Sequence, residues 1–275
     1  MKILDGLELS GYIKERQAKA VRALRQSWRV IPRLAIVRTG DNSVIDVYVR
    51  LKKSYGEDIG VEVDIYSPSE NELLSQIEKL NSDENVYGII IQLPLANPSQ
   101  TDEAINAVAL EKDVDGLGEG SGFTPATAMA IDWLLAGYAI DLYGKKIAVI
   151  GKGRLVGAPL AKLWKSSGYD VVVCDSKSDL QKEVQPAEVI VTATGVPGLL
   201  KSQMVRDGAV VVDAGTASEN GKIVGDVSQD LRNRQDLTIT PEKGGVGPLT
   251  IAALFDNVIT AARKVANQKG QQDLG

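Results

Sequence analysis

The chain has 275 residues, of which 44% are hydrophobic and 24% charged, and its formal net charge at pH 7 is −5. The length favours two domains, and the composition argues against a disordered, fibrous or membrane protein. The sequence has no basic stripe of the kind that binds phosphate backbones, so no nucleic-acid partner is expected.

Residue types that are absent or rare narrow the chemistry further. The chain has no histidine, which excludes Ser-His-Asp and Cys-His catalysis and histidine-bound metals, and no metal site is predicted. The single cysteine, Cys174, excludes an internal disulfide, and charges at Lys2 and Asp5 come too early for a secretory signal. We therefore expect a cytoplasmic protein with no membrane partner.

Hydrophobic, β-rich runs alternate with amphipathic helical patterns along the chain, which is typical of an α/β fold. In the first half, strands are predicted near residues 34–37, 61–65 and 88–91, and helices start near Leu9, Ser43, Ser69 and Thr101. A glycine-rich turn at residues 116–122 then interrupts the pattern. We place a crossing between two domains there.

The second half contains five more predicted strands, near residues 146–150, 170–174, 188–192, 209–213 and 237–239. Their β-branched runs suit a parallel sheet that is buried on both faces. A last helix is expected from about Leu249 to Ala266, returning to the first domain, and a frayed polar tail is expected from Asn267 to Gly275.

A tyrosine and a lysine, Tyr48 and Lys52, lie four residues apart on the predicted helix that starts near Ser43. This spacing puts the phenol and the ammonium on one face of the helix. Partial burial would lower the pKa of the lysine toward a range useful for proton transfer. The alternative is an ordinary amphipathic surface pair. Short-chain dehydrogenases share the Tyr-x-x-x-Lys spacing, but there it follows the glycine loop, whereas here it precedes it.

Two further polar positions are candidates for ligand contacts, which collect at strand ends in open α/β sheets. Gln92 ends the strand at 88–91, shortly before Pro94, which stops further strand pairing. Asp113 and Asp115 lie in the acidic segment 111–116, where a carboxylate could accept hydrogen bonds from an amino-substituted heterocycle. The alternatives are a polar strand cap and an ordinary acidic turn.

A glycine loop directly follows the strand at 146–150 and opens a helix; it comprises Gly151, Lys152, Gly153, Arg154, Leu155, Val156 and Gly157. Glycines in this context let the backbone approach a pyrophosphate, which then sits at the helix N-terminus. The Gly-x-Gly-x-x-x-Gly spacing is one residue longer than the usual fingerprint, and the alternative is an ordinary glycine turn. We predict a dinucleotide site.

Asp175 closes the following strand, 18 residues after Gly157. A carboxylate at this position can bind the adenosine ribose hydroxyls and would repel a 2′-phosphate, which favours NAD over NADP. Opposing signals come from nearby side chains that could bind or neutralise that phosphate: Lys152, Arg154, Ser176 and Lys177. Both cofactors stay open, with a lean to NAD.

A second glycine cluster lies between Glu242 and Thr250, where two adjacent glycines, a third glycine and then Pro248 open an apolar helix. The cluster indicates a backbone that passes very close to another group. The alternative is a tight turn that starts a helix, since glycine supplies unusual φ angles and proline suits a first helical turn.

In this order, the segments resemble the bifunctional methylenetetrahydrofolate dehydrogenase/cyclohydrolase family over nearly the whole chain. The resemblance rests on these segments: Gly40-Asp41-Asn42 with Tyr48-Val49-Arg50 and Lys52, Gln92-Leu93-Pro94-Leu95, residues 112–116, residues 156–159, residues 221–227, residues 239–241 and residues 244–250.

The resemblance implies two α/β domains with a cleft between them. Residues 1–122 plus 249–275 would form a three-layer αβα catalytic domain that binds folate, and residues 123–248 a Rossmann-like NAD(P)-binding domain through which homodimers form. The implied function, in folate one-carbon metabolism and purine biosynthesis, is oxidation of methylene-tetrahydrofolate to methenyl-tetrahydrofolate with NADP or NAD, followed by hydrolysis to formyl-tetrahydrofolate.

The resemblance also implies roles for individual residues. Lys52 would be the central catalytic residue, assisted by Gln92. Tyr48 would stack on or orient the folate, and Asp115 would hold the amino-substituted edge of the pterin. Further folate contacts would come from Leu93, Pro94, Gly245, Pro248, Leu249 and Thr250, and further cofactor contacts from Thr194, Gly195 and Thr216.

The chain departs from the family pattern at positions that bear on both ligands. The segment between Gly116 and Phe123 is shorter than the usual folate-site loop, and Asp175 replaces a common histidine. Other departures are Ile45, Pro125-Ala126-Thr127-Ala128-Met129-Ala130, Lys152-Gly153 and Glu242-Lys243. Two alternatives therefore stay open: a dehydrogenase of similar architecture acting on another pterin or a shikimate-like acid, and a non-catalytic dinucleotide- or folate-binding module.

Overall fold

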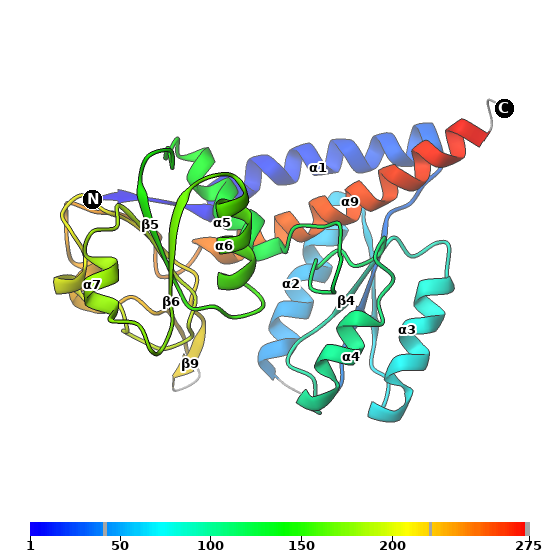
Figure 1. Cartoon of the computed structure of the whole chain (residues 1–275). Helices are drawn as coiled ribbons and strands as arrows, with labels where there is room; N and C mark the ends of the chain where they lie inside the picture. The colour runs from blue at the N-terminus through cyan, green and yellow to red at the C-terminus, as the bar shows by residue number, and fades with distance from the viewer. Residues whose placement is uncertain (41–42, 220–221, 273–275) are drawn as a thin grey trace. The chain divides into compact units, whose positions relative to one another are not determined.

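The computed structural model describes residues 1–40, 43–219 and 222–272, which form two compact units (Figure 1). The six-stranded unit contains residues Met1–Ser10 and Thr127–Thr250, and the three-stranded unit contains Gly11–Ala126 and Ile251–Gly275. Asp41, Asn42 and Gly221, which contribute to the family resemblance, lie outside the described residues.

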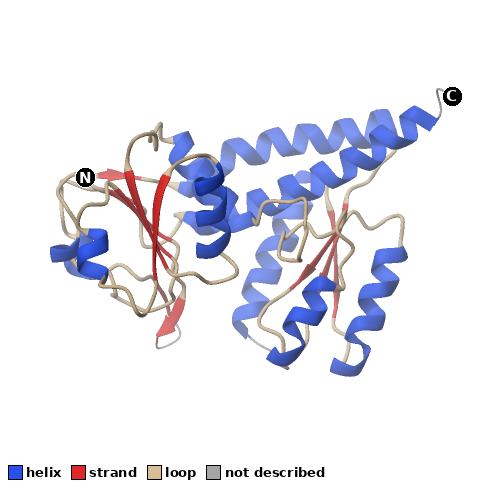
Figure 2. Cartoon of the chain, in the orientation of Figure 1, coloured by secondary structure: helices blue, strands red, loops and turns tan. Residues whose placement is uncertain are grey.

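The three-stranded unit has a parallel sheet in the order β3-β2-β4, flanked by helices (Figure 2). Its strands are β2 (Arg33–Val37), β3 (Glu62–Tyr66) and β4 (Gly88–Ile91). Its helices are α2 (Ser43–Ile59), α3 (Leu73–Ser82), α4 (Thr101–Asn106), most of α1 (Gly6–Trp28) and most of α9 (Val246–Gln272), with short 3₁₀ turns at Glu70–Glu72 and Pro98–Gln100.

Both faces of this sheet are covered, which makes three layers. Ala35 and Ile89 share one hydrophobic core with Ile77 of α3 and Ile105 of α4. On the opposite face, a Cβ on Gly88 would lie 3.3 Å from a methyl group of Val258 on α9. Parallel strands need this double cover because successive side chains point to opposite faces.

The six-stranded unit has a parallel sheet in the order β1-β11-β8-β7-β5-β6. Its strands are β1 (Lys2–Ile3), β5 (Lys146–Ile150), β6 (Asp170–Cys174), β7 (Val189–Thr192), β8 (Val210–Asp213) and β11 (Thr238–Ile239), and a separate antiparallel pair is formed by β9 (Ala217–Glu219) and β10 (Lys222–Val224). Its helices are α5 (Ala126–Gly137), α6 (Gly157–Ser166), α7 (Leu180–Val184) and α8 (Gln229–Arg232), with a 3₁₀ turn at Ser202–Met204.

Helices cover both faces of this sheet as well. Ile150 and Val211 share a buried core with Val184 of α7 and Leu231 of α8. Trp164 of α6 is fully buried, and its indole N–H donates a hydrogen bond of 2.9 Å to Asp132 on α5. The two-domain α/β architecture with parallel sheets therefore confirms the predicted fold class.

The structure differs from the expected boundaries at several points. The first ten residues belong to the six-stranded unit, because Lys2 of β1 pairs with Thr238 of β11. The compact units meet along the chain at Ala126 and Thr127, after the glycine-rich turn at residues 116–122. The prediction of a frayed tail is wrong for residues 267–272, since α9 continues to Gln272.

Candidate active site

A lysine site is formed within the three-stranded unit by Lys52, Gln92, Tyr48 and Asp115. Lys52 lies on α2, and its Nζ donates a hydrogen bond of 2.7 Å to Oε1 of Gln92. Gln92 directly follows β4, and its backbone N–H donates to the carbonyl of Val37 at 2.8 Å. The carboxyl end of β4 thus fixes Gln92, which accepts the hydrogen bond from Lys52. The structure therefore brings together the two residues that the resemblance pairs.

Burial shifts the pKa values of both charged groups in the lysine site. Burial lowers the pKa of Lys52, and the negative charge of Asp115 partly opposes this shift. Burial also raises the pKa of Asp115, where Lys52 opposes the shift and Asp113 adds to it. Each group is therefore closer to its neutral form than it would be in water, which suits proton transfer.

Tyr48 lies one helical turn before Lys52 on α2 and is half-buried. Burial raises the pKa of its phenol, so Tyr48 stays neutral at physiological pH. A neutral, half-exposed ring can stack on a flat ligand without bringing a second charge to the lysine.

The segment around Asp115 is held by buried neighbours. A small cavity beside Asp115 is lined by Ile89, Ile91, Ile105, Val108, Asp113 and Leu117. Lys112 is turned away from this chemistry: its Nζ donates to the carbonyl oxygens of Leu80, Asn81 and Asp83 at 3.0, 2.7 and 2.7 Å. Lys112 therefore caps the C-terminal end of α3. This contact gives the first residue of the family segment 112–116 a structural role.

Leu93 and Pro94 continue the chain beyond Gln92. The peptide bond between them is cis. The side-chain amide of Gln92 donates to the carbonyl of Leu93 at 3.2 Å, which leaves its oxygen directed at Lys52. Leu93 is half-buried and Pro94 is exposed, so both are open to a ligand beside the lysine site.

The glycine loop lies between β5 and α6, in the six-stranded unit. Gly151 has a φ of +102°, and a Cβ there would lie 2.5 Å from the carbonyl oxygen of Ala193. A Cβ on Gly157 would lie 2.0 Å from the carbonyl oxygen of Gly151, whereas a Cβ on Gly153 would meet open space. Two glycines are thus required by packing, and the third leaves room above the loop for a phosphate group.

The remaining residues of this loop fit a dinucleotide. Lys152, Arg154 and Leu155 are exposed, and Val156 is half-buried. Within the described part of the chain, no side chain caps the start of α6. The backbone N–H of Ala158 donates to the carbonyl of Gly153 at 3.1 Å and Pro159 has no N–H, so an anion at this end would bind the N–H of Gly157.

Asp175 forms an ion pair with the glycine loop. Lys152 Nζ lies 2.6 Å from Asp175 Oδ2, and the backbone N–H of Lys177 donates to Oδ1 at 2.9 Å. The hydrogen bond from Lys152 is the main reason why the pKa of Asp175 is lowered. Ser176 is exposed beside this pair. The carboxylate predicted to bind the ribose is therefore ionised, and the ammonium of Lys152 offsets part of its negative charge.

Thr194, Gly195 and Thr216 lie at the carboxyl ends of β7 and β8, where ligands bind in open parallel sheets. A Cβ on Gly195 would lie 3.3 Å from the carbonyl oxygen of Thr216, so these two loops are neighbours. The N–H and Oγ1 of Thr194 both donate to Oδ2 of Asp226, at 2.7 and 2.9 Å.

Sequence reasoning missed Asp226 as a structural support of this loop, although it lies in a family segment. Asp226 is fully buried, and its Oδ1 has no hydrogen-bond partner among the described residues. Burial raises the pKa of this carboxyl, and the Thr194 hydrogen bonds oppose the shift.

Four predicted folate contacts belong to the six-stranded unit, unlike the lysine site. Gly245 and Leu249 are buried, Leu249 completely, and the hydroxyl of Thr250 donates to the carbonyl of Val246 at 3.2 Å. Pro248 is the third residue of α9 and is half-buried. The Leu249 side chain is therefore part of a core, and its predicted ligand contact could only involve the backbone.

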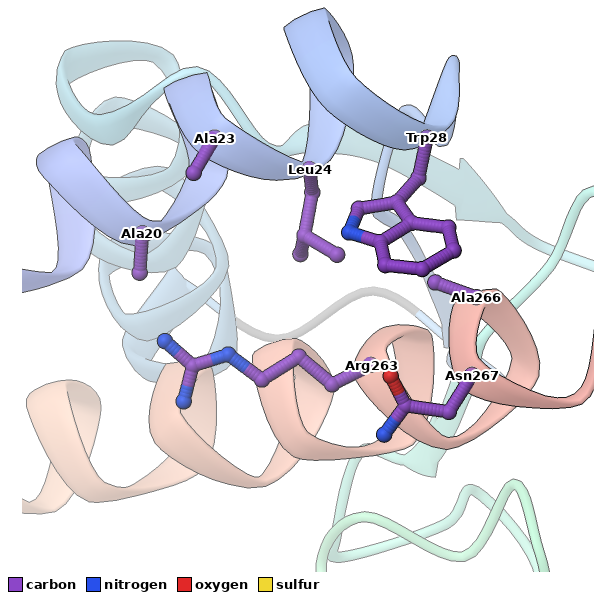
Figure 3. Close-up of a pocket in the computed structure, with 7 residues that line it drawn as sticks. All are labelled: Ala20, Ala23, Leu24, Trp28, Arg263, Ala266 and Asn267. Carbon is purple, nitrogen blue, oxygen red and sulfur yellow. The ribbon is translucent and has the colours of Figure 1, made fainter. Parts of the chain in front are cut away.

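A separate pocket lies between α1 and α9, where Trp28 points toward Ala266 (Figure 3). It is lined by Ala20, Ala23, Leu24, Trp28, Arg263, Ala266 and Asn267, none of which is a predicted site residue. Among the described residues there is no group of three acidic or cysteine side chains that could hold a metal. Cys174 is buried, which raises the pKa of its thiol to about 11 and makes it a poor nucleophile.

The lysine site and the glycine loop correspond to two matching family models. The model of the tetrahydrofolate dehydrogenase/cyclohydrolase catalytic domain matches residues 4–115. The model of the NAD(P)-binding domain of the same family matches residues 125–266. None of the helices in the described ranges has the length and apolar character needed to cross a membrane.

The chain is also similar to known proteins over almost its full length. It is 38% identical over 283 residues to the bifunctional protein FolD of Campylobacter jejuni strain 81-176, covering 97% of this chain and 100% of the relative. The crystal structure of FolD from Campylobacter jejuni has a TM-score of 0.91 and 37% identity, covering 96% of this chain and 99% of that one. The Trypanosoma brucei FolD complexed with NADP and an inhibitor has a TM-score of 0.89 and 28% identity, covering 96% and 97%.

Proposed function

The chain belongs to the tetrahydrofolate dehydrogenase/cyclohydrolase family, and from this premise we propose that Lys52 transfers protons in its active site. The protein is a bifunctional enzyme. It oxidises methylene-tetrahydrofolate to methenyl-tetrahydrofolate with NAD(P) and hydrolyses that product to formyl-tetrahydrofolate. A shikimate-like substrate or a non-catalytic module is not needed to explain any observed feature.

The observation that carries the proposal is the hydrogen bond of 2.7 Å between the half-buried Lys52 and Gln92. In the hydrolytic step, water adds to the methenyl carbon and loses a proton, and a ring nitrogen gains a proton as its bond to that carbon breaks. The lowered pKa of Lys52 lets its neutral amine take the first proton and its ammonium give up the second. Gln92 keeps Nζ in one place during both transfers.

The dehydrogenase step needs orientation more than proton transfer. A bound nicotinamide supplies the acceptor for the hydride that leaves the methylene carbon. Tyr48 presents a neutral ring for stacking on the folate. Asp115 accepts hydrogen bonds from the amino-substituted edge of the pterin, and those donors favour its ionised form against the effect of burial.

The dinucleotide is held by the glycine loop, by Asp175 and Ser176, and by Thr194, Gly195 and Thr216. We favour NAD because a carboxylate directly after β6, as at Asp175, would accept hydrogen bonds from ribose hydroxyls and would repel a 2′-phosphate. Lys152 reduces that repulsion through its ion pair, so NADP remains a weaker cofactor. The Trypanosoma brucei relative binds NADP, which makes the preference a property to be measured for this chain.

The wider setting also follows from the family resemblance. We propose a cytoplasmic homodimer formed through the NAD(P)-binding domain. Folate contacts from Leu93, Pro94, Gly245, Pro248, Leu249 and Thr250 belong to the same proposal.

The test is oxidation of methylene-tetrahydrofolate by the purified protein, run in parallel with NAD and NADP and followed by absorbance. Reduced cofactor that appears without accumulation of methenyl-tetrahydrofolate is expected, because the hydrolytic step consumes the intermediate. Methenyl-tetrahydrofolate that accumulates in the amount of reduced cofactor would contradict a proton-transferring role of Lys52.

A further inference from the structure

A buried asparagine on α9 links the two ends of the loop at residues 116–123. The side-chain amide of Asn257 donates to the carbonyl of Val114 at 2.8 Å and to the carbonyl of Thr124 at 3.0 Å. Val114 directly precedes Asp115, and Thr124 directly follows Phe123, where the loop ends. All of these residues belong to the three-stranded unit.

The side-chain amide of Asn257 meets the hydrogen-bonding needs of this position, whereas leucine or aspartate would not. The side chain is 7% exposed, and its neighbours Phe255, Val258 and Ile259 are buried hydrophobic residues. A buried polar group is destabilising unless its hydrogen-bonding capacity is used. A primary amide carries two N–H donors on one nitrogen, so a single side chain can bind both carbonyls. Leucine has no donor, and an aspartate would place negative charge against two carbonyl oxygens.

The interior of the loop is held by a second buried side chain. Asp113 is 3% exposed, and its carboxylate accepts hydrogen bonds from the backbone N–H groups of Gly116 at 3.2 Å and Gly118 at 2.9 Å. Asp115 therefore has a fixed residue on each side: Val114 is bound to Asn257, and Gly116 is bound to Asp113.

We propose that Asn257 and Asp113 are positioning residues that hold Asp115 against the pterin, so that the last helix of the chain sets folate affinity. This inference rests on the proposed function, because it assumes that Asp115 binds the substrate. It explains how the short segment from Gly116 to Phe123 keeps a defined shape, because residues at its two ends and in its middle are bound to buried side chains.

The test uses Asn257→Ala in the full chain, with Asn267→Ala as the matched control, since Asn267 is exposed on the same helix. The expected result is an increase of about five- to tenfold in KM for methylene-tetrahydrofolate, corresponding to the loss of one or two buried hydrogen bonds. The kcat and the KM for the dinucleotide should stay within about threefold of wild type, and the control should change neither KM. An unchanged folate KM in Asn257→Ala would overturn the proposal.

A double-mutant cycle separates positioning from a general structural effect. If Asn257 acts through Asp115, then Asn257→Ala should raise the folate KM in the wild-type background and add nothing to Asp115→Ala. Fully additive effects would overturn the inference while leaving the role of Asp115 intact. A folate KM that is unchanged in Asp115→Ala alone would instead refute the proposed function of Asp115.

A second variant covers the case in which Asn257→Ala does not fold. Asp113→Asn keeps the size of the side chain and one acceptor oxygen, and the same rise in folate KM is expected. Hydrogen exchange of residues 114–124 should be faster in either folded variant than in the Asn267→Ala control. Failure of both variants to fold would assign the two residues to the core and overturn their positioning role.

Discussion

The lysine site and the glycine loop, which we propose hold the folate and the dinucleotide, are built in opposite ways. The lysine site uses half-buried side chains whose pKa values are shifted by burial and whose positions are set by side-chain hydrogen bonds. The glycine loop uses exposed backbone shaped by glycines, and its main charge contact is the surface ion pair of Lys152 with Asp175. Proton transfer requires desolvation, whereas dinucleotide binding requires backbone that a ligand can approach.

Replacing Lys52 should have the largest effect, because it should reduce hydrolysis and leave dinucleotide binding unchanged. Lys52→Met removes the amine and keeps the apolar stem, so hydrolysis of methenyl-tetrahydrofolate should fall by about 10² to 10⁴ in kcat, the usual contribution of general acid–base catalysis. Dinucleotide affinity, measured by calorimetry, should be unchanged because the glycine loop lies in the other compact unit. Near-normal hydrolysis by this variant would remove the assigned mechanism.

The glycine loop should respond to changes in backbone space. Gly157→Ala introduces a Cβ 2.0 Å from the carbonyl of Gly151, so it should lower the free energy of unfolding by about 1–3 kcal/mol. Gly153→Ala meets open space and should leave that free energy within about 0.5 kcal/mol of wild type while weakening dinucleotide binding. Denaturant unfolding with and without NAD measures both quantities, and equal destabilisation by the two variants would contradict the assignment.

Cofactor choice should depend on the half-buried carboxylate of Asp175. Asp175→Ser removes the charge that repels a 2′-phosphate and frees Lys152 to bind it, so the NADP/NAD ratio of kcat/KM should rise by about three- to tenfold, as expected for charges at the protein surface. Raising the ionic strength should reduce the change. If the ratio stays constant, the ribose is recognised elsewhere.

The smallest expected effect is the pH dependence that Lys52 gives to stability. The pKa of Lys52 in the folded protein lies below its ordinary value of 10.5, so between the two values the unfolded chain binds the extra proton. The contribution of Lys52 to the free energy of unfolding should therefore rise with pH through this window and stay reduced below it. Urea unfolding of wild type and Lys52→Met at several pH values measures this, and a constant difference between them would contradict the pKa shift.

Much of the fold could be predicted from local sequence patterns. The buried parallel strands are continuous β-branched runs, and β2, β4, β5 and β8 lie within one residue of their predicted ranges. The strand β1 and the antiparallel pair of β9 and β10 were not predicted, because these runs of two or three residues show no period and lie in no longer β-branched stretch. The bounds of the compact units depend on contacts between residues far apart in the sequence, such as the pairing of β1 with β11. Local sequence patterns therefore could not predict them.

The contacts of the candidate site also differ in whether the sequence could predict them. Spacing and position at a strand end marked Lys52 and Gln92 as separate candidates, and their pairing was implied by the family resemblance. The contacts of Asn257 could not, since its partners lie 143 and 133 residues away along the chain. The available signal was a pair of polar residues, Asp256 and Asn257, within a largely apolar helical run, which identifies neither the buried one nor its partners.

Both compact units are discontinuous along the chain, and this has a consequence for their synthesis. Translation delivers residues from the N-terminus at about 5–20 per second, and domains made of one continuous segment can fold as they emerge. Here Lys2 must wait for Thr238 to complete its strand pair, and Tyr55 must wait for Phe255, with which its ring stacks at a centroid distance of 5.1 Å. Neither unit can therefore reach its final fold on the ribosome until most of the chain has been made, and α9 is the segment that completes the three-stranded unit.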